Sequence, residues 1–462
     1  MRSVGSILII GCVLLVGYFV AGPADAQDPC AEPKERALVL GGGGSKGAFQ
    51  AGAVYHLIVD RGCDFAEISG TSSGALIGAL LAQAEVASES EQSLDSLERE
   101  AEAVVALWTS VRRTKDLMKS RPLAILRVGL FGLESMKNFE PLRELLGERI
   151  ALERLASGRA LRVGTTSFAD GHYREIVINP GGHVDPLTAF DVLLGSAMVP
   201  VFGELPRIAV AEGGRPEEAV QYADGGLRHS TPVTSYFRSC GVREESDSEP
   251  TSACTPFPGD GTPPHGRIEQ LFIVVTSPYA RRSDWRPPMD PKAFKRGTRQ
   301  IRDGRKILVR SYDLLVDTIY REDLDEMLML NDLVAWRARE ATRIGAIPFF
   351  PVESYNRDEA APDSVSQPYE IAIVVPERED TDPMTMFEFE PQTIARQLYC
   401  GCLAADGMMQ TRFGSESMAT GCAERFPRPP EKRGKKAEYR EGSDWEAGIC
   451  RDERTAPAEI LR

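Results

Sequence analysis

The sequence predicts an α/β fold in which helices cover a mostly parallel central sheet. The main observation is a strand, turn and helix unit that occurs twice in succession. Residues 37–40 form a short apolar run, and after a glycine loop residues 48–59 carry apolar side chains at helical spacing. Residues 65–69 then indicate a second strand, which enters a tight turn and a small apolar helix at residues 75–84. Two successive units of this kind favour parallel strands, since each helix returns the chain to the same edge of the sheet.

Later segments continue this alternation of strands and helices. Residues 161–168 and 173–178 predict the two strands of a hairpin. The acidic segment 85–102 predicts a solvated helix, and the chain beyond residue 413 is expected to be mostly polar loop. Further helices are expected at residues 185–198, 305–343 and 391–409, and further strands at residues 219–222, 270–276 and 370–375.

Length alone predicts two or three domains, and a single enlarged α/β domain with insertions fits equally well. The chain has 462 residues, of which 42% are hydrophobic and 26% charged, so it can bury a large core. Its formal net charge of -14 excludes nucleic acid as an expected partner, because an acidic surface repels phosphate backbones. The predicted divisions are a signal peptide at 1–26, a linker at 27–36, a core at 37–237, a surface insertion at 238–267, the rest of the same domain at 268–412 and a polar, disulfide-tied tail at 413–462.

The N-terminus has the pattern of an export signal. Arg2 precedes an apolar stretch at residues 4–20, and the sequence A-D-A at residues 24–26 matches a small-x-small cleavage pattern. The protein is therefore expected to be exported. Two alternatives stay open. In the first, the apolar stretch is not cleaved and serves as a membrane anchor. In the second, Cys12 is lipidated, since residues 9–12 resemble a lipoprotein box.

The cysteine content agrees with export. Nine cysteines less Cys12 leaves eight, an even number, and structural disulfides are their expected use in an oxidising compartment. Cys240 and Cys254 flank a loop rich in Ser, Pro and Gly that a disulfide between them would close. The spacing of Cys400 and Cys402 is not the C-x-x-C of a zinc knuckle or redox motif, so no metal site is expected. Four cysteines cluster towards the C-terminus: Cys400, Cys402, Cys422 and Cys450.

The residues Gly70-Thr71-Ser72-Ser73-Gly74 match the pattern G-x-S-x-G. A serine on a sharp turn between a strand and a helix exposes its hydroxyl at the end of the sheet, and the flanking glycines avoid collisions across the turn. The helix that follows directs its positive end at the serine, which favours developing negative charge. Ser72 is therefore the candidate nucleophile, with Ser73 as the neighbouring alternative.

A glycine loop between the first strand and its helix has two interpretations. Gly42, Gly44 and Gly47 satisfy G-x-G-x-x-G, which is also the dinucleotide-binding fingerprint, with Asp60 or Asp64 near the expected acidic position. Both interpretations depend on bare backbone N–H groups that face an anion at the start of a helix. The anion is the tetrahedral oxyanion in a hydrolase and a pyrophosphate in a dinucleotide-binding fold. The loop alone leaves both open.

A third motif, Asp224-Gly225-Gly226, follows the strand expected at residues 219–222. An aspartate at a strand end can take the proton of a serine directly if burial raises its pKa above the usual value of about 3.9. A turn built by Asp-Gly is the structural alternative. Among the five histidines, His229 is the only serious rival as the base. The gap from Asp224 to His229 is too short for an α/β-hydrolase triad, so His229 is given a minor or structural role.

The three motifs, in this order, resemble the patatin-like phospholipase family, which has a G-G-G-x-[RK]-G loop, a G-x-S-x-G elbow and a D-G-[GA] motif. The resemblance is clear over residues 36–233, weaker over 268–409 and absent from the tail. It implies a patatin-like, three-layer αβα sandwich with insertions and an irregular C-terminal tail. Residues 196–202 also resemble the family's S-x-x-x-P segment near the substrate pocket. One departure lies at residues 228–230, where the family often has asparagines, and this leaves substrate preference open.

The resemblance also implies roles for individual residues. Ser72 and Asp224 would form a catalytic dyad that needs no histidine, metal or other cofactor. Backbone N–H groups of Gly42, Gly43 and Gly44 would hold the oxyanion. Lys46 stands where arginine is commoner in the family, which preserves the charge but loses bidentate geometry. The other supporting motif positions are Gly47, Gly70, Gly74, Gly225 and Gly226.

The expected function is that of an exported, serine-dependent lipid acyl ester hydrolase. The substrate is expected to be a phospholipid, a lysophospholipid or another ester, with transient contact with a membrane surface. The apolar segment at residues 123–133 favours long acyl chains, with ordinary core packing as its alternative. Two alternative functions remain open: a nucleotide-dependent enzyme that uses the G-x-G-x-x-G loop, and a non-catalytic module of the same fold.

Overall fold

The computed structural model describes residues 29–32, 34–86, 90–121, 135–178, 186–209, 219–233, 236, 268–277, 279, 304–344, 368–376, 389–426 and 450. Several expectations lie outside these residues: the export signal with Cys12, the apolar segment at 123–133, the insertion at 238–267 and the pairing of Cys240 with Cys254. Within the described part of the chain, no helix combines the length and the apolar character needed to cross a membrane.

An eight-stranded sheet forms the centre of the fold, with the strand order β10-β9-β1-β2-β5-β8-β7 and with β6 paired to β5 off this path. Five strands run parallel: β1 (Arg36–Leu40), β2 (Glu67–Thr71), β5 (Ala160–Ser167), β9 (Gln270–Val274) and β10 (Glu370–Val374). Three more pair antiparallel at one end of the sheet: β6 (Tyr173–Ile178), β7 (Arg207–Ile208) and β8 (Val220–Asp224). The mostly parallel sheet and the hairpin of β5 and β6 are therefore confirmed.

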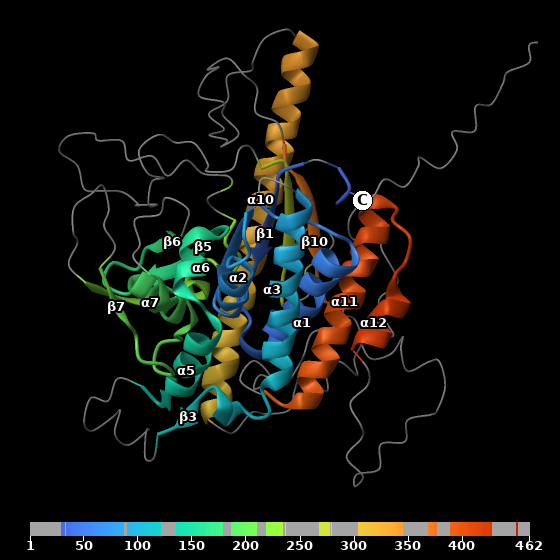
Figure 1. Ribbon diagram of the computed structural model, residues 1–462. Helices are drawn as coiled ribbons and strands as arrows, with labels where there is room; N and C mark the ends of the chain where they lie inside the picture. Colours follow the sequence, from blue (N-terminus) through green and yellow to red (C-terminus); the bar gives the residue numbers. More distant parts are fainter. Residues whose placement is uncertain are drawn as a thin grey trace, which may run out of the picture.

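Helices cover both faces of this sheet, which makes three layers (Figure 1). One side carries α1 (Gly47–Tyr55), α2 (Ser73–Leu81), α3 (Ser90–Ser110), α7 (Pro186–Ala197) and α11 (Pro391–Phe413). The other side carries the long helix α10 (Gly304–Ile344).

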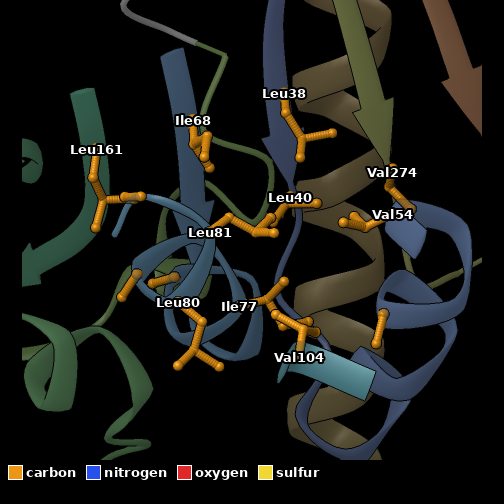
Figure 2. Close-up of a cluster of buried hydrophobic side chains, with 14 of the residues drawn as sticks. Leu38, Leu40, Val54, Ile68, Ile77, Leu80, Leu81, Val104, Leu161 and Val274 are labelled. Atoms are coloured by element: carbon orange, nitrogen blue, oxygen red, sulfur yellow. The ribbon is translucent and has the colours of Figure 1, made fainter. Parts of the chain in front are cut away.

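The alternation of side chains along β1 explains the two faces. Leu38 and Leu40 point into the cluster that holds α1 and α2, where Figure 2 shows Leu40 beside Leu81. Val39, between them, packs in the separate cluster with α10. Each such leucine is fully buried, and full burial stabilises the fold by about 1.5–3 kcal/mol per side chain. A strand that is apolar on both faces must lie inside the molecule, as the sequence of β1 predicts.

One expectation about a helix needs correction. The acidic helix α3 is not simply solvated, because it buries one face against the core through Leu97, Ala101, Val104 and Trp108. Beyond residue 413, where mostly loop is expected, the described residues include the short helix α12 (Ala419–Arg425). The remaining elements are α5 (Glu140–Arg149), α6 (Leu152–Ser157), the strand pair β3 (Lys119–Ser120) and β4 (Lys137–Asn138), and short helical turns at Gly44–Lys46, His56–Asp60, Thr114–Asp116 and Gly225–Leu227.

Among the cysteines that the structure describes, three disulfides tie peripheral segments to the core. Two lie in the expected C-terminal cluster, Cys400–Cys450 and Cys402–Cys422, and the second joins α11 to α12. The third, Cys30–Cys63, ties the segment before β1 to the loop after α1. The expected structural use of the cysteines is confirmed for these six.

Candidate active site

Ser72 lies on a strained turn between β2 and α2. Its backbone has φ 56° and ψ -124°, a conformation that side chains rarely adopt and that the surrounding structure must hold in place. The turn is tight on both sides. A Cβ atom at Gly70 would lie 2.4 Å from the Gly74 carbonyl oxygen, and one at Gly74 would lie 2.3 Å from the Leu40 carbonyl oxygen. Only glycine fits at these two positions, which is why G-x-S-x-G predicts this elbow.

A serine on α7 braces the elbow. The Ser72 backbone N–H donates to Ser196 Oγ at 2.9 Å, and Ser196 Oγ donates to the Gly164 carbonyl at 2.7 Å. Ser196 is fully buried, so this bridge is sheltered from water. The S-x-x-x-P segment thus lies beside the pocket as expected, and Ala197 and Val199 line it. The contact of Ser196 with the elbow itself was not anticipated.

Asp224 reaches Ser72 from the end of β8. Its carboxylate is 3% exposed and accepts a hydrogen bond from the Gly226 N–H at 2.8 Å. Burial raises the pKa of Asp224 to about 6, and hydrogen bonding from the Ser72 side chain and the Gly226 N–H opposes this rise. Gly225 allows the close approach of β8 to β5, because a Cβ atom there would lie 2.5 Å from the Gly164 carbonyl oxygen. A buried carboxylate with a raised pKa beside a hydroxyl can act as a general base near neutral pH.

The glycine loop lies over Ser72 and is held from two sides. The Gly42 N–H donates to the Ser230 carbonyl at 2.9 Å, which differs from the expectation that this amide joins an oxyanion hole. Thr276 Oγ1 donates to the Gly42 carbonyl at 2.6 Å. The peptide bond is planar and trans, so fixing this carbonyl directs the Gly43 N–H from the opposite edge of the same plane. Within the described residues, the N–H groups of Gly43 and Gly44 have no acceptor.

The remaining motif positions support this loop from its far end. Lys46 closes the helical turn by donating its backbone N–H to the Gly43 carbonyl at 3.1 Å, and its side chain is not among the described residues that line the pocket. Gly47 begins α1, where a Cβ atom would lie 2.7 Å from the Trp108 ring. Their role is therefore to shape the loop.

A cavity opens at Ser72. Gly42, Gly43, Gly44, Ser72 and Asp224 line its polar end. Aliphatic and aromatic side chains line the rest, among them Leu76, Ile77, Trp108, Phe139, Leu142 and Phe389. This lining suits an apolar ligand.

Two aromatic rings stack in the cavity wall. Trp108 of α3 and Phe389, which precedes α11, have ring centroids 6.1 Å apart and planes inclined by 14°. The sequence analysis did not single out either residue. Trp108 could have been found as part of the apolar stripe of α3, whereas nothing in the sequence marks Phe389.

His229 is bound to a carboxylate of α10. Its Nδ1 lies 2.6 Å from Asp323 Oδ1 on α10, and its ring packs edge-on against Tyr173 at 4.6 Å between centroids. His229 is not among the described residues that line the cavity. The geometry therefore supports a structural role for His229, as expected.

The two acidic residues that could serve a dinucleotide site at the glycine loop are paired with other side chains. Asp60 pairs with His56 at 3.0 Å and with Arg425 at 3.4 Å. Asp64 pairs with Arg159 at 2.7 Å. A dinucleotide-binding fold needs an acidic side chain that faces the ribose beside the loop, and neither of these carboxylates is among the described residues around the cavity.

One group of metal-ligand side chains comes together in the described part of the chain, outside the cavity. His56, Cys402 and Cys422 have ligand atoms within 4.8 Å of one another. Both sulfur atoms belong to the disulfide between the two cysteines, so they cannot act as thiolate ligands in this state. His56 is instead tied to Asp60, and to Asp406 of α11 at 3.5 Å.

Comparison with known proteins gives one family match. Residues 38–236 match the family model described as patatin-like phospholipase. No curated protein matches the sequence.

Several solved structures share a distant similarity. VipD from Legionella pneumophila has 11% identity, with 82% of this chain and 67% of that chain covered, at a TM-score of 0.29. Full-length ExoU from Pseudomonas aeruginosa, solved in complex with SpcU, has 18% identity over 38% of this chain and 39% of that chain, at a TM-score of 0.20. Human GIVD cytosolic phospholipase A2 has 11% identity over 54% of this chain and 43% of that chain, at a TM-score of 0.23. This chain therefore spans less than half the length of the last two.

Proposed function

We propose that this chain, whose residues 38–236 form a patatin-like phospholipase domain, hydrolyses acyl ester bonds of lipids through an acyl-enzyme on Ser72. The single observation that carries the proposal is the convergence of three groups at one end of an apolar cavity. These groups are the hydroxyl of Ser72, the buried carboxylate of Asp224 and the amides of Gly43 and Gly44, which have no acceptor among the residues that the structure describes.

The proposed mechanism uses these groups in two half-reactions. Asp224 accepts the proton of Ser72 as Ser72 Oγ attacks the ester carbonyl. The N–H groups of Gly43 and Gly44 stabilise the oxyanion that forms. The ester bond breaks, the leaving alcohol takes the proton from Asp224, and an acyl-enzyme remains. Asp224 then takes a proton from water, whose oxygen attacks the acyl carbonyl, and the proton returns to Ser72 as the fatty acid leaves.

The test is a screen of the purified protein against phospholipid, lysophospholipid, triacylglycerol and short-chain esters, with fatty acid release as the measurement. A cavity lined by apolar side chains should favour long acyl chains over acetyl or butyryl groups, because each buried methylene contributes about 0.8 kcal/mol. Release of long-chain fatty acid from at least one lipid class is expected. No release from any of these esters by folded protein would reject the proposal.

The pH dependence of kcat/KM should report the carboxylate of Asp224. Only its ionised form can accept a proton, and its pKa is raised to about 6. The value of kcat/KM should therefore be constant above about pH 7 and fall by about tenfold per pH unit below pH 6. Initial rates between pH 4 and pH 8 on a soluble long-chain ester measure this acidic limb of the pH profile, in which kcat/KM falls.

Two controls make the pH profile specific. Circular dichroism at each pH separates loss of activity from unfolding. The residual kcat/KM of Asp224→Asn should not show this fall below pH 6, because an amide does not titrate in this range. A wild-type profile that stays flat down to pH 5, or a limb that persists in Asp224→Asn, would assign the base to another group.

Leu76 offers a test of the acyl site. It lies four residues after Ser72 on α2, so its side chain is one helical turn from the nucleophile and lines the cavity. Leu76→Trp should fill the space next to the ester and exclude long acyl chains. We expect kcat/KM for a palmitoyl ester to fall by about 10- to 100-fold, while the value for an acetyl ester changes by less than about threefold. Equal effects on both esters would mean that the chain does not bind here.

A further inference from the structure

A carboxylate on α10 holds the segment that supports the glycine loop. Asp323 is 6% exposed, and its Oδ2 accepts a hydrogen bond from the Thr231 backbone N–H at 3.0 Å. Its other oxygen, Oδ1, lies 2.6 Å from Nδ1 of His229. The ring of His229 packs against Tyr173. This contact holds the histidine in place, and the histidine in turn holds Oδ1 of Asp323.

This hydrogen bond acts on one rigid peptide plane. The Thr231 N–H and the Ser230 carbonyl belong to the same peptide unit and point in opposite directions, because that unit is planar and trans. The Ser230 carbonyl is the acceptor of the Gly42 N–H at 2.9 Å. Asp323 therefore sets the orientation of the group that holds Gly42, although it does not contact the loop itself.

Gly42 passes this orientation to the next amide. Its carbonyl is fixed by Thr276, and the N–H on the other edge of that peptide plane is the one of Gly43, a residue that lines the cavity. Gly42 is thus held by Ser230 at its N–H, which belongs to the Gly41–Gly42 peptide, and by Thr276 at its carbonyl, which belongs to the Gly42–Gly43 peptide. Because the two planes meet at the Cα of Gly42, loss of the Ser230 contact frees the first plane to rotate and lets the second shift with it.

We propose that Asp323 is a positioning residue for the oxyanion hole, acting through the Ser230–Thr231 peptide to aim the Gly43 N–H at the developing oxyanion. The inference rests on the proposed function. Asp323 lies outside residues 38–236, so the family match assigns it no role. A buried carboxylate is costly to desolvate, and an apolar side chain could fill the same space on a helix that packs against the sheet. The hydrogen bond from the Thr231 N–H is a reason for a carboxylate at this position, and packing alone supplies no such reason.

The test compares Asp323→Leu with Asp323→Asn. Leucine has no acceptor for the Thr231 N–H, whereas the asparagine amide oxygen accepts from it and the amide nitrogen donates to His229 in its other tautomer. We expect Asp323→Leu to lower kcat by about 10- to 100-fold with KM changed by less than about twofold, since a small misplacement of a catalytic group has effects of this size. Asp323→Asn should recover kcat to within about threefold of the wild type.

A second readout isolates the oxyanion. A long-chain trifluoromethyl ketone forms a hemiketal oxyanion on a serine, so its Ki should rise in Asp323→Leu by the same factor as kcat/KM falls. The Ki of the matching long-chain alcohol, which makes no oxyanion, should not change. A merely destabilised fold would not separate these two inhibitors.

Asp325→Leu is the matched control. Asp325 lies on the same helix and accepts a hydrogen bond from the Tyr279 hydroxyl at 2.7 Å, with no contact to the glycine loop. This variant should keep the wild-type kcat even if its melting temperature falls. If Asp323→Leu does not yield folded protein by circular dichroism, Asp323→Ser, which removes the carboxylate with less disturbance, takes its place.

The outcomes distinguish this inference from the proposed function. Turnover that survives Ser72→Ala contradicts the proposed function. An inactive Ser72→Ala together with wild-type kcat in folded Asp323→Leu overturns only the role of Asp323. A loss in Asp323→Asn as deep as in Asp323→Leu, or an equal loss in Asp325→Leu, overturns it as well.

Discussion

Ser72→Ala is expected to lower ester hydrolysis by about five to six orders of magnitude. The hydroxyl is the only nucleophile that the proposed mechanism uses, so no acyl-enzyme can form without it. The fold should survive, because Gly70 and Gly74 permit the turn and the Ser72 amide keeps its hydrogen bond to Ser196. Initial rates on the best substrate from the ester screen, with melting curves for both proteins, measure the effect.

Ser73→Ala is the control for this variant. Ser73 is the next residue along the chain, lines the same cavity and is 6% exposed, so the two substitutions disturb the site to a similar degree. Ser73→Ala should keep kcat within about tenfold of the wild type. An inactive Ser73→Ala beside an active Ser72→Ala would transfer the nucleophile to the neighbouring serine.

Asp224→Asn should lower kcat by about three to four orders of magnitude. An amide has the same shape as the carboxylate and keeps the hydrogen bond from the Gly226 N–H, but it cannot accept the proton of Ser72. The loss is smaller than for Ser72→Ala because the nucleophile and the amides of Gly43 and Gly44 remain. The free energy of unfolding should not fall. The raised pKa of Asp224 shows that the fold disfavours its ionised form, and asparagine removes that buried charge.

Single-turnover measurements show which step is lost in Asp224→Asn. Both acylation and deacylation need the base, so the acylation rate on a p-nitrophenyl ester should fall together with the steady-state rate. Asp325→Asn alters a hydrogen-bonded carboxylate that is not among the described residues lining the cavity, so it is the matched control and should be unaffected. A wild-type acylation rate in Asp224→Asn would mean that another group accepts the proton of Ser72.

The sequence predicted the parts of the site that depend on local geometry. The elbow at Ser72 needs glycine at two positions because backbone atoms approach closely there, and that requirement is visible in G-x-S-x-G. The two strand–turn–helix units were visible for a similar reason, since apolar periodicity follows directly from burial. The strand boundaries were less exact. The second strand was expected at residues 65–69 and lies at Glu67–Thr71, because pairing with β1 and β5 decides where it begins and ends.

The walls and supports of the site depend on long-range contacts, so the sequence carried little signal for them. The apolar stripe of α3, with Leu97, Ala101, Val104 and Trp108 at intervals of three and four, was present but was outweighed by the acidic residues around it. Phe389 reaches the cavity only because α11 packs beside α1. Asp323 is an ordinary acidic residue of a long helix until the fold brings it to Thr231. The glycine loop predicted three oxyanion amides, and only the fold shows that Ser230 occupies the first of them.

The most direct measurement of the central claim is peptide mapping by mass spectrometry after reaction with a long-chain fluorophosphonate, which phosphonylates activated serines. The account predicts a single adduct, on Ser72, whose formation is slowed in Asp224→Asn and blocked in Ser72→Ala. An adduct on Ser73, Ser230 or any other residue in an active enzyme, or full activity after complete labelling elsewhere, would contradict it.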